Sequence, residues 1–431
     1  MGAYWTLSVH GLSLLEGENY INGEILQLFR REDARIDHAR ADAAQVDEYG
    51  KYEYVSNVAE MRERLDLMGF TIGRAAGDFE AGRQLELDDR ASQRSRYTKF
   101  LRAYSFDKWL STFRRLLRHG KFPDVEGRHP RSLSVQQFIC NRKHDALVGF
   151  FHSDPRSVLR GCLQAAPAGW PVRLDLVDLV NAGYLDGDQG EYVRLTDAAM
   201  EYSLTSPFVI LTEGTFDAWV LQRTLVLVYP HLTDLFTFMD FDSSIAPGGA
   251  GHLVTTIKAF IGSGIKNRIL AVFDNDTAAH AALRGLTGIA IPPNINWCTL
   301  PNLARLRSHP TVGPQGQQAA DINGRACSIE LFFGPDIVGR GKKRKVVRWK
   351  SYDNAMRQYQ GEVDDKGTLQ KKFREKVKSA TPAMLISDPA WADIRYLWAY
   401  LRGQAQAIGL KMLQTSSRPA SMGAGIFWHV E

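Results

Sequence analysis

Residues 4–15 alternate between apolar and polar side chains with a period of two, which is typical of short β-strands. Trp5, Leu7 and Val9 are the apolar positions of a first piece, and a second piece begins at Leu12 after Gly11. The pattern predicts a small β-hairpin that turns at Gly11.

From about residue 20 to 120, apolar positions recur at the three- and four-residue spacing of amphipathic helices. One predicted helix gathers Val58, Met61, Leu65 and Met68 on one face, with Gly69 as its C-terminal cap. A second carries Phe106, Trp109, Leu110, Phe113, Leu116 and Leu117. We therefore expect residues 1–170 to form a mostly helical N-terminal domain.

Residues 171–205 have a pattern of their own. Leu174, Val177 and Val180 follow helical spacing, and a polar turn at 186–190 leads to a strand at 192–195. This order is similar to the recognition helix and wing of a winged-helix module, which would contact DNA. A plain helix that ends at a glycine before a tight turn gives the same pattern, so an ordinary connector is the alternative.

After Pro207 the rhythm changes to short apolar strands separated by helix-length segments, which predicts a parallel sheet built from crossover units. The expected strands are 208–211, 235–239, 268–273 and 296–300. Residues 301–320 are rich in Pro, Gly and Gln and are expected to form a surface excursion. We therefore expect the sheet domain to span residues 206–335. Residues 336–431 are expected to form a basic segment followed by a helical C-terminal extension. Its aromatic residues, among them Trp391 and Trp398, are expected to pack in a core.

The fold class expected for the 431-residue chain is therefore α/β plus mostly α, in more than one domain. Hydrophobic residues make up 44% and charged residues 23% of the chain, which disfavours disordered and fibrous classes. The sequence has neither an apolar run long enough to span a membrane nor a secretory signal, so we expect a cytoplasmic protein. Buried free thiols are expected at the scattered Cys140, Cys162, Cys298 and Cys327.

The net charge of +5 permits a phosphate-rich partner without requiring one. Seven Lys or Arg residues lie within residues 340–350, which contain no Asp or Glu. We call residues 340–350 the basic segment. A nucleic-acid backbone is the partner such a run favours, and the contact residues would be Lys342, Lys343, Arg344, Lys345 and Arg348. A solvated surface loop is the alternative.

Acidic residues follow three predicted strands in succession. Glu213 follows the first, Asp240 the second, and Asp274 with Asp276 the third, while Asp217 lies one turn beyond Glu213. Because parallel strands all point the same way, these carboxylates are expected to meet at one edge of the sheet, where open α/β sheets bind ligands.

Gathered carboxylates repel one another unless a cation lies among them, and a set of oxygen ligands favours Mg²⁺ or Mn²⁺. Such a metal supports phosphodiester cleavage. Three glycines near the acids, at positions 214, 248 and 249, would let the backbone approach a phosphate closely. Helix caps and solvated charges are the alternative for any single acid, though not for the series.

Two of these stretches resemble the signature motifs of the Toprim catalytic domain. The first is Val-Ile-Leu-Thr-Glu-Gly at 209–214, and the second is Phe-Asp-Asn-Asp at 273–276. The resemblance covers about residues 206–335 and implies a Rossmann-like fold. It also implies that Glu213 is an acid, a base or a metal ligand, and that Asp274 and Asp276 hold Mg²⁺. Glu330 is a candidate for a further acid.

The chain as a whole resembles bacterial proteins with a HEPN/Toprim N-terminal domain. The residues that carry this likeness are Leu-Phe-Arg-Arg-Glu-Asp at 28–33 and the helix at 62–69, in front of the Toprim-like motifs. The family implies a role in bacterial conflict or antiphage defence. Arg114 and His119 have the Arg-x-x-x-x-His spacing of HEPN ribonucleases, in which His119 would deprotonate a ribose hydroxyl and Arg114 would stabilise the phosphorane.

Three functions follow from these patterns. The leading one is a metal-dependent nuclease centred on Glu213, Asp240, Asp274 and Asp276. The second is a metal-independent HEPN ribonuclease. Its site would be shared between two copies of the chain, so a homodimer would be expected. The third is a sensor that binds nucleic acid without cutting it.

Overall fold

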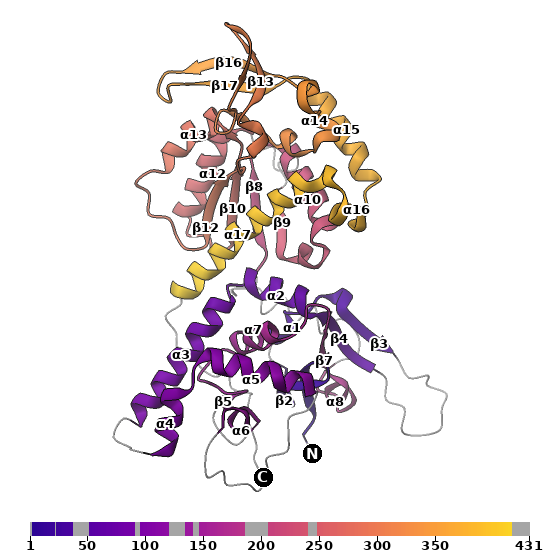
Figure 1. The fold of residues 1–431 in the computed structure, drawn as a ribbon, viewed down its shortest axis with the longest axis vertical. Helices are drawn as coiled ribbons and strands as arrows, with labels where there is room; N and C mark the ends of the chain where they lie inside the picture. Colours follow the sequence, from indigo (N-terminus) through magenta and orange to yellow (C-terminus); the bar gives the residue numbers. More distant parts are fainter. Residues whose placement is uncertain are drawn as a thin grey trace. The chain divides into compact units, whose positions relative to one another are not determined.

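The computed structural model describes residues 2–21, 23–37, 51–90, 95–119, 134–140, 146–185, 206–239 and 248–415. The chain divides into two compact units (Figure 1). One contains residues 1–205 and 413–431, and the other contains residues 206–412. No helix among the described residues is both long enough and apolar enough to cross a membrane.

The first unit is built on a five-stranded antiparallel sheet in the order β2-β1-β7-β4-β3. Its strands are β1 (Tyr4–Val9), β2 (Leu12–Glu18), β3 (Ala34–Asp37), β4 (Lys51–Asn57) and β7 (Pro171–Asp175). The expected hairpin is confirmed, because β1 and β2 pair around Gly11, whose φ of 82° suits a residue without a Cβ.

Helices complete this unit. They are α1 (Gly23–Leu26), α2 (Val58–Leu67), α3 (Ile72–Asp89), α4 (Arg96–Ala103), α5 (Phe106–His119), α6 (Val135–Cys140), α7 (Pro155–Ala165) and α8 (Val177–Asn181), with a two-stranded ribbon of β5 (Ala146–Leu147) and β6 (Phe150–Phe151). The helices expected at 58–68 and 106–117 are confirmed as α2 and α5. The buried Arg64 of α2 donates to the carbonyl oxygens of Gln27 and Leu28 and so fixes the 28–33 segment.

The sequence pattern did not predict the sheet of this unit, although helices make up most of the regular structure described within residues 1–170. The helix expected through Leu174, Val177 and Val180 forms only over α8, because Leu174 belongs to β7. Val172 and Leu174 are buried in β7 whereas Arg173 and Asp175 are exposed, which is the period of a strand. β7 pairs with both β1 and β4, so it lies inside the sheet. The turn and strand expected at 186–195 fall outside the described residues.

The second unit contains a four-stranded parallel sheet in the order β12-β10-β8-β9 (Figure 1). Its strands are β8 (Phe208–Thr212), β9 (Phe236–Phe238), β10 (Arg268–Phe273) and β12 (Ile295–Thr299), and its crossover helices are α10 (Thr215–Val228), α12 (Ala250–Gly262) and α13 (Thr277–Leu283). The parallel sheet is confirmed. All six residues of β10 are buried, because helices cover both faces of the sheet.

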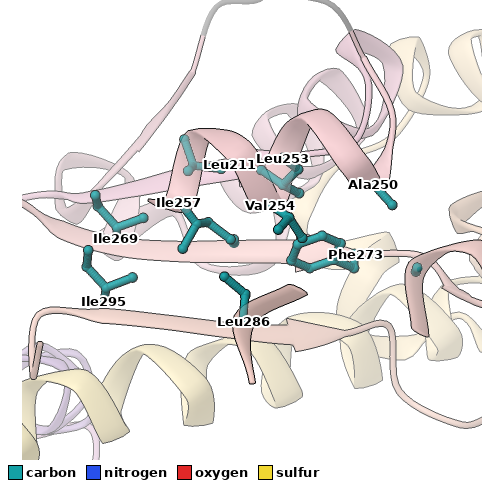
Figure 2. Close-up of a cluster of buried hydrophobic side chains, with 11 residues drawn as sticks. Leu211, Ala250, Leu253, Val254, Ile257, Ile269, Phe273, Leu286 and Ile295 are labelled. Atoms are coloured by element: carbon teal, nitrogen blue, oxygen red, sulfur yellow. The ribbon is translucent and has the colours of Figure 1, made fainter. Parts of the chain in front are cut away.

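One face of the sheet packs on α12 (Figure 2). Leu253, Val254 and Ile257 of the helix meet Ile269 and Phe273 of β10 in a buried apolar cluster. The opposite face receives α17 (Ala392–Thr415), because the Trp398 ring lies 5.8 Å from that of Phe236 on β9. The expected core role of Trp391 and Trp398 is confirmed, since both are buried.

A second sheet follows, in the order β14-β13-β16-β17. Its strands are β13 (His309–Gly313), β14 (Gly316–Ala320), β16 (Val347–Asp353) and β17 (Gln358–Val363). The short β11 (Asn275–Asp276) and β15 (Ala326–Cys327) pair with each other, and helices α14 (Pro335–Val338), α15 (Lys366–Lys378) and α16 (Pro382–Ser387) complete the unit.

The stretch expected as a surface excursion at 301–320 does have its exposed part in β14, but it forms two paired strands that the sequence pattern did not predict. Pro310 is compatible with β13 because it lies near the start of the strand, and Gly313 and Gly316 flank the turn into β14. The basic segment is also not a separate extension. It leads into β16, which pairs in parallel with β13 and antiparallel with β17.

Candidate active site

Glu213 and Asp274 lie side by side at the C-terminal edge of the parallel sheet. Thr212 of β8 is in register with Val272 of β10, so the residues that follow the two strands emerge together. The backbone N–H of Asp274 donates to Oε1 of Glu213 at 2.9 Å. The convergence expected from the strand pattern thus holds for this pair.

Asp217 and Glu330 extend the acidic group. Asp217 lies in the first turn of α10, directly after the loop that carries Glu213. Glu330 is fully buried, accepting hydrogen bonds from Ser328 Oγ at 2.6 Å and from Gln370 Nε2 at 2.8 Å. Its carboxylate also lies 3.3 Å from the amino group of Lys366.

Asp276 has a structural task in addition to any chemical one. Its Oδ1 accepts the backbone N–H of Ala279 and caps α13. Its Oδ2 accepts from Gln360 Nε2 at 2.6 Å, which ties the site to β17, 84 residues away in the chain. Both oxygens keep a second lone pair for another ligand.

Burial and mutual repulsion disfavour ionisation of these acids. Burial raises the pKa of Glu213 to about 7, and the charges of Asp276 and Asp217 add to this, while the Asp274 N–H acts in the opposite direction. Burial, followed by the charge of Glu330, raises the pKa of Asp217 to about 7. Burial and the charges of Asp217, Glu213 and Asp276 raise the pKa of Asp274 well above its usual value. Without a cation these acids therefore tend to keep their protons, and a bound cation would favour their ionised forms.

Lys366 is a candidate site residue that the sequence patterns did not indicate. It begins α15, and its amino group is the cation within this acidic group. Burial alone would lower the pKa of Lys366, but the charges of Glu330, Asp274 and Asp217 outweigh burial and raise it. The lysine thus stays protonated and compensates part of the negative charge. Several other lysines lie in the same helix, so the sequence pattern does not distinguish Lys366 from them.

The acidic group suits a hard divalent cation in two respects. All of its donors are carboxylate oxygens. When ionised, these carboxylates carry more negative charge than the one positive charge of Lys366 balances. In the side-chain arrangement of the described residues, however, no three or more His, Cys, Asp or Glu are grouped to hold one ion. Asp240, which the sequence adds to the group, lies outside the described residues.

The three glycines singled out from the sequence lie around Glu213. Gly214 is the N-cap of α10, and its backbone forms a hydrogen bond with Asp217 that lowers the pKa of that acid. Gly249 has a φ of 100° and donates its N–H to the carbonyl oxygen of Glu213 at 2.7 Å. A Cβ on Gly248 would lie 2.9 Å from that same oxygen. In this structure Gly248 and Gly249 therefore hold the Glu213 loop against the start of α12.

Three residues of the basic segment, Lys345, Arg348 and Lys350, pair with acids from the following strand and turn. Arg348 pairs with Asp364 at 3.0 Å, and Lys345 with Asp365 at 2.7 Å. Arg344 donates instead to the backbone oxygens of Arg305 and Ser308. Lys343 is exposed and has no ion pair among the described residues, while the side chain of Lys342 lies outside them.

Arg114 and His119 lie in the last turns of α5, and both are exposed. Five positions along an α-helix correspond to a rotation of about 140° around its axis, so the two side chains leave the helix in different directions. Within one chain they do not converge on a common point.

Comparison with known proteins defines the N-terminal part of the chain. Residues 1–200 match the family described as HEPN/Toprim N-terminal domain 1. The expected resemblance to proteins with a HEPN/Toprim N-terminal domain is confirmed for residues 1–200. No curated protein matches the chain, and no solved structure matches it. The family match ends before Glu213 and so does not include the acidic edge.

Proposed function

We propose that the second unit is a Toprim-type, metal-dependent nuclease that cleaves phosphodiester bonds of a nucleic acid. The observation that carries the proposal is the contact between Glu213 and Asp274 at the ends of adjacent parallel strands, with Asp217, Glu330 and Lys366 beside them. The HEPN/Toprim N-terminal match supports the nuclease class. A role in bacterial antiphage defence is part of the same proposal.

The residues have distinct tasks in this proposal. Asp274 and Asp276 would hold the Mg²⁺ or Mn²⁺ ion, which when bound supplies positive charge that polarises the scissile phosphate. Glu213 would serve either as a further ligand of that ion or as the base that takes the proton of the attacking water. Lys366 would stabilise the additional negative charge of the phosphorane. Glu330 holds Lys366 in place through its 3.3 Å ion pair.

The test is cleavage of end-labelled single-stranded DNA, single-stranded RNA and duplex DNA of one sequence by the full chain. Each substrate is incubated with Mg²⁺, Mn²⁺ or EDTA. We expect metal-dependent cleavage that falls by at least about 100-fold in Asp274→Asn, because the amide cannot supply the carboxylate charge. Glu375→Gln is the matched control, since its carboxylate is exposed on α15 and pairs only with Lys378 among the described residues. It should cleave like the wild type.

The same assay tests the HEPN alternative through His119→Ala. Cleavage of RNA in EDTA that disappears in this variant would replace the metal-dependent proposal, because attack by a ribose hydroxyl needs no cation. Cleavage that persists in Asp274→Asn at the wild-type rate would also refute the assignment of the acidic edge.

A further inference from the structure

Three aromatic side chains share one face of the hairpin formed by β16 and β17. Tyr352 is opposite Tyr359, and Trp349 is opposite Gly361, with an irregularity after Trp349 that keeps all three rings on one face. The Tyr352 and Tyr359 rings lie 5.0 Å apart, and the Trp349 and Tyr359 rings 6.0 Å apart. We call Trp349, Tyr352 and Tyr359 the aromatic row.

Glycines on both neighbouring strands make room for Trp349. A Cβ on Gly313 of β13 would lie 2.8 Å from Cδ1 of the indole, and a Cβ on Gly361 of β17 would lie 2.9 Å from Cε3. These two atoms belong to the two different rings of the indole. The ring therefore lies across the sheet, with one side against two strands that have no side chain there.

The outer part of the row is open to solvent. Tyr352 is 48% and Tyr359 is 42% exposed, although each carries a large apolar ring. A cross-strand aromatic pair stabilises a hairpin, and this accounts for the contact between the two tyrosines. It does not account for three adjacent rings on one face, two of them with much of their surface in water.

The hairpin is fixed to the candidate active site by three hydrogen bonds. Thr277 Oγ1 donates to the carbonyl oxygen of Tyr359 at 2.8 Å, and the N–H of Ala278 donates to Oε1 of Gln360. Gln360 also donates to Asp276, a candidate metal ligand. The strand that carries Tyr359 is thus tied to the helix that begins at the acidic edge.

The net charge of residues 340–365, together with the exposed rings, favours a negatively charged polymer whose bases can stack on the rings. Residues 340–365 contain eight Lys or Arg against four Asp or Glu, so a positive excess remains after ion pairing. Arg357 at the hairpin turn is exposed. A single-stranded nucleic acid combines phosphates for these cations with unstacked bases for the rings. A duplex keeps its bases stacked inside and offers the rings no base face.

We propose that the aromatic row binds single-stranded nucleic acid by base stacking, on the hairpin that is tied to the acidic edge. The inference deepens the proposed function, because it assigns a single-stranded substrate to that site. The binding itself requires no cleavage and can be tested apart from it.

The test is fluorescence anisotropy of labelled 12-nucleotide single strands, as DNA and as RNA, and of the matching duplex, titrated with the full chain in EDTA. We expect single strands to bind more tightly than the duplex, and the DNA and RNA arms to identify the preferred sugar. Tyr352→Ala/Tyr359→Ala should weaken single-strand binding by roughly 10- to 100-fold, because each base–ring stack lost costs about 1–3 kcal/mol. Tyr352→Phe/Tyr359→Phe keeps both rings and should bind within about threefold of the wild type.

Two controls separate stacking from folding and from catalysis. Tyr396→Ala removes a tyrosine that is also 48% exposed but lies on α17, and it should leave binding unchanged. Circular dichroism melting of each variant confirms that it is folded, and Trp349→Phe provides a second, milder change in the row. Normal single-strand binding by the wild type without cleavage in Mg²⁺ or Mn²⁺ would refute the nuclease and leave this inference standing.

Three results would overturn the inference. One is wild-type affinity in the folded double alanine variant, and another is duplex binding as tight as single-strand binding. The third is a change in sedimentation, without a change in nucleic-acid binding, when the tyrosines are replaced, because the row would then be a contact between copies of the chain.

Discussion

The acidic edge and the basic segment show opposite relations between sequence and charge. The acids are scattered along the chain, yet Glu213, Asp217, Asp274 and Glu330 gather in the folded structure around one cation, Lys366. The basic residues are consecutive in the chain, yet Lys345, Arg348 and Lys350 each pair with an acid between 362 and 365.

This difference teaches that a cluster of charge in the sequence is not a cluster of unbalanced charge in the molecule. Antiparallel pairing of β16 with β17 brings the basic segment opposite Glu362 and its neighbours. Parallel pairing of β8 with β10 brings like charges together, with burial to strengthen their repulsion. Uncompensated charge, rather than charge density in the chain, marks the better functional candidate.

Among the variants that test this comparison, removal of the Lys366 amino group should change the measured activity most. We expect Lys366→Ala to lower the rate of metal-dependent cleavage by roughly 100-fold, because one donor to a developing oxyanion is typically worth that much. Lys366→Arg keeps the charge and should recover part of the rate. The measurement is single-turnover cleavage of the preferred strand, with Lys378→Ala, an exposed lysine of the same helix, as the control. A rate in Lys366→Ala equal to that of Lys378→Ala would exclude a catalytic role.

Metal should stabilise the acidic edge even without a substrate. We expect millimolar Mg²⁺ to raise the melting temperature of the wild type by a few degrees, because an ion that binds only the folded state stabilises it. Asp274→Asn should show less than half of this increase, since one of the candidate ligands has lost its charge. Differential scanning fluorimetry with and without Mg²⁺ measures both. An equal increase in the two proteins would place the ion elsewhere.

Neutralisation of Asp217 should stabilise the protein in metal-free buffer. The folded-state pKa of Asp217 is raised to about 7 from an ordinary value of 3.8, so its contribution to stability is fully present below pH 3.8 and is lost as the pH rises through 7. Asp217→Asn carries no charge at any pH. Its melting temperature should exceed that of the wild type by about 2–5 °C at pH 8, and by little at pH 4.

The control for Asp217→Asn is again Glu375→Gln, whose carboxylate is 63% exposed. Exposed ion pairs contribute little to stability, so the melting temperature of this variant should stay within about 1 °C of the wild type at both pH values. A stabilisation of Asp217→Asn that does not grow with pH would mean that repulsion is not its cause.

The smallest effects are expected in the basic segment. Because Arg348 is paired with Asp364, Arg348→Ala should weaken nucleic-acid binding by no more than about twofold. Asp364→Asn frees Arg348 and should tighten binding by a similar factor, while Lys343→Ala should weaken it more than Arg348→Ala does. Anisotropy titrations at two salt concentrations measure all three. A large loss in Arg348→Ala alone would show that its ion pair opens to bind phosphate.

Local sequence patterns predicted much of the fold. The buried strand at 268–273 was found from its apolar run, and α2 and α5 from their helical spacing. β7 was missed because it has only five residues, and its Leu174 also fits helical spacing with Val177. β13 and β14 were missed because Pro, Gly and Gln favour turns, whereas pairing with β16 overrides that preference.

The sequence by itself determined which acids follow which strands, and through the direction of parallel strands it placed Glu213 beside Asp274. Only the tertiary structure decided that Lys366 and Gln360 join them, and that three residues of the basic segment are paired with acids. The physical reason is that the side-chain period of a helix or strand is local. Burial and ion pairing depend on which distant segments pack together, and no short window of sequence contains both partners.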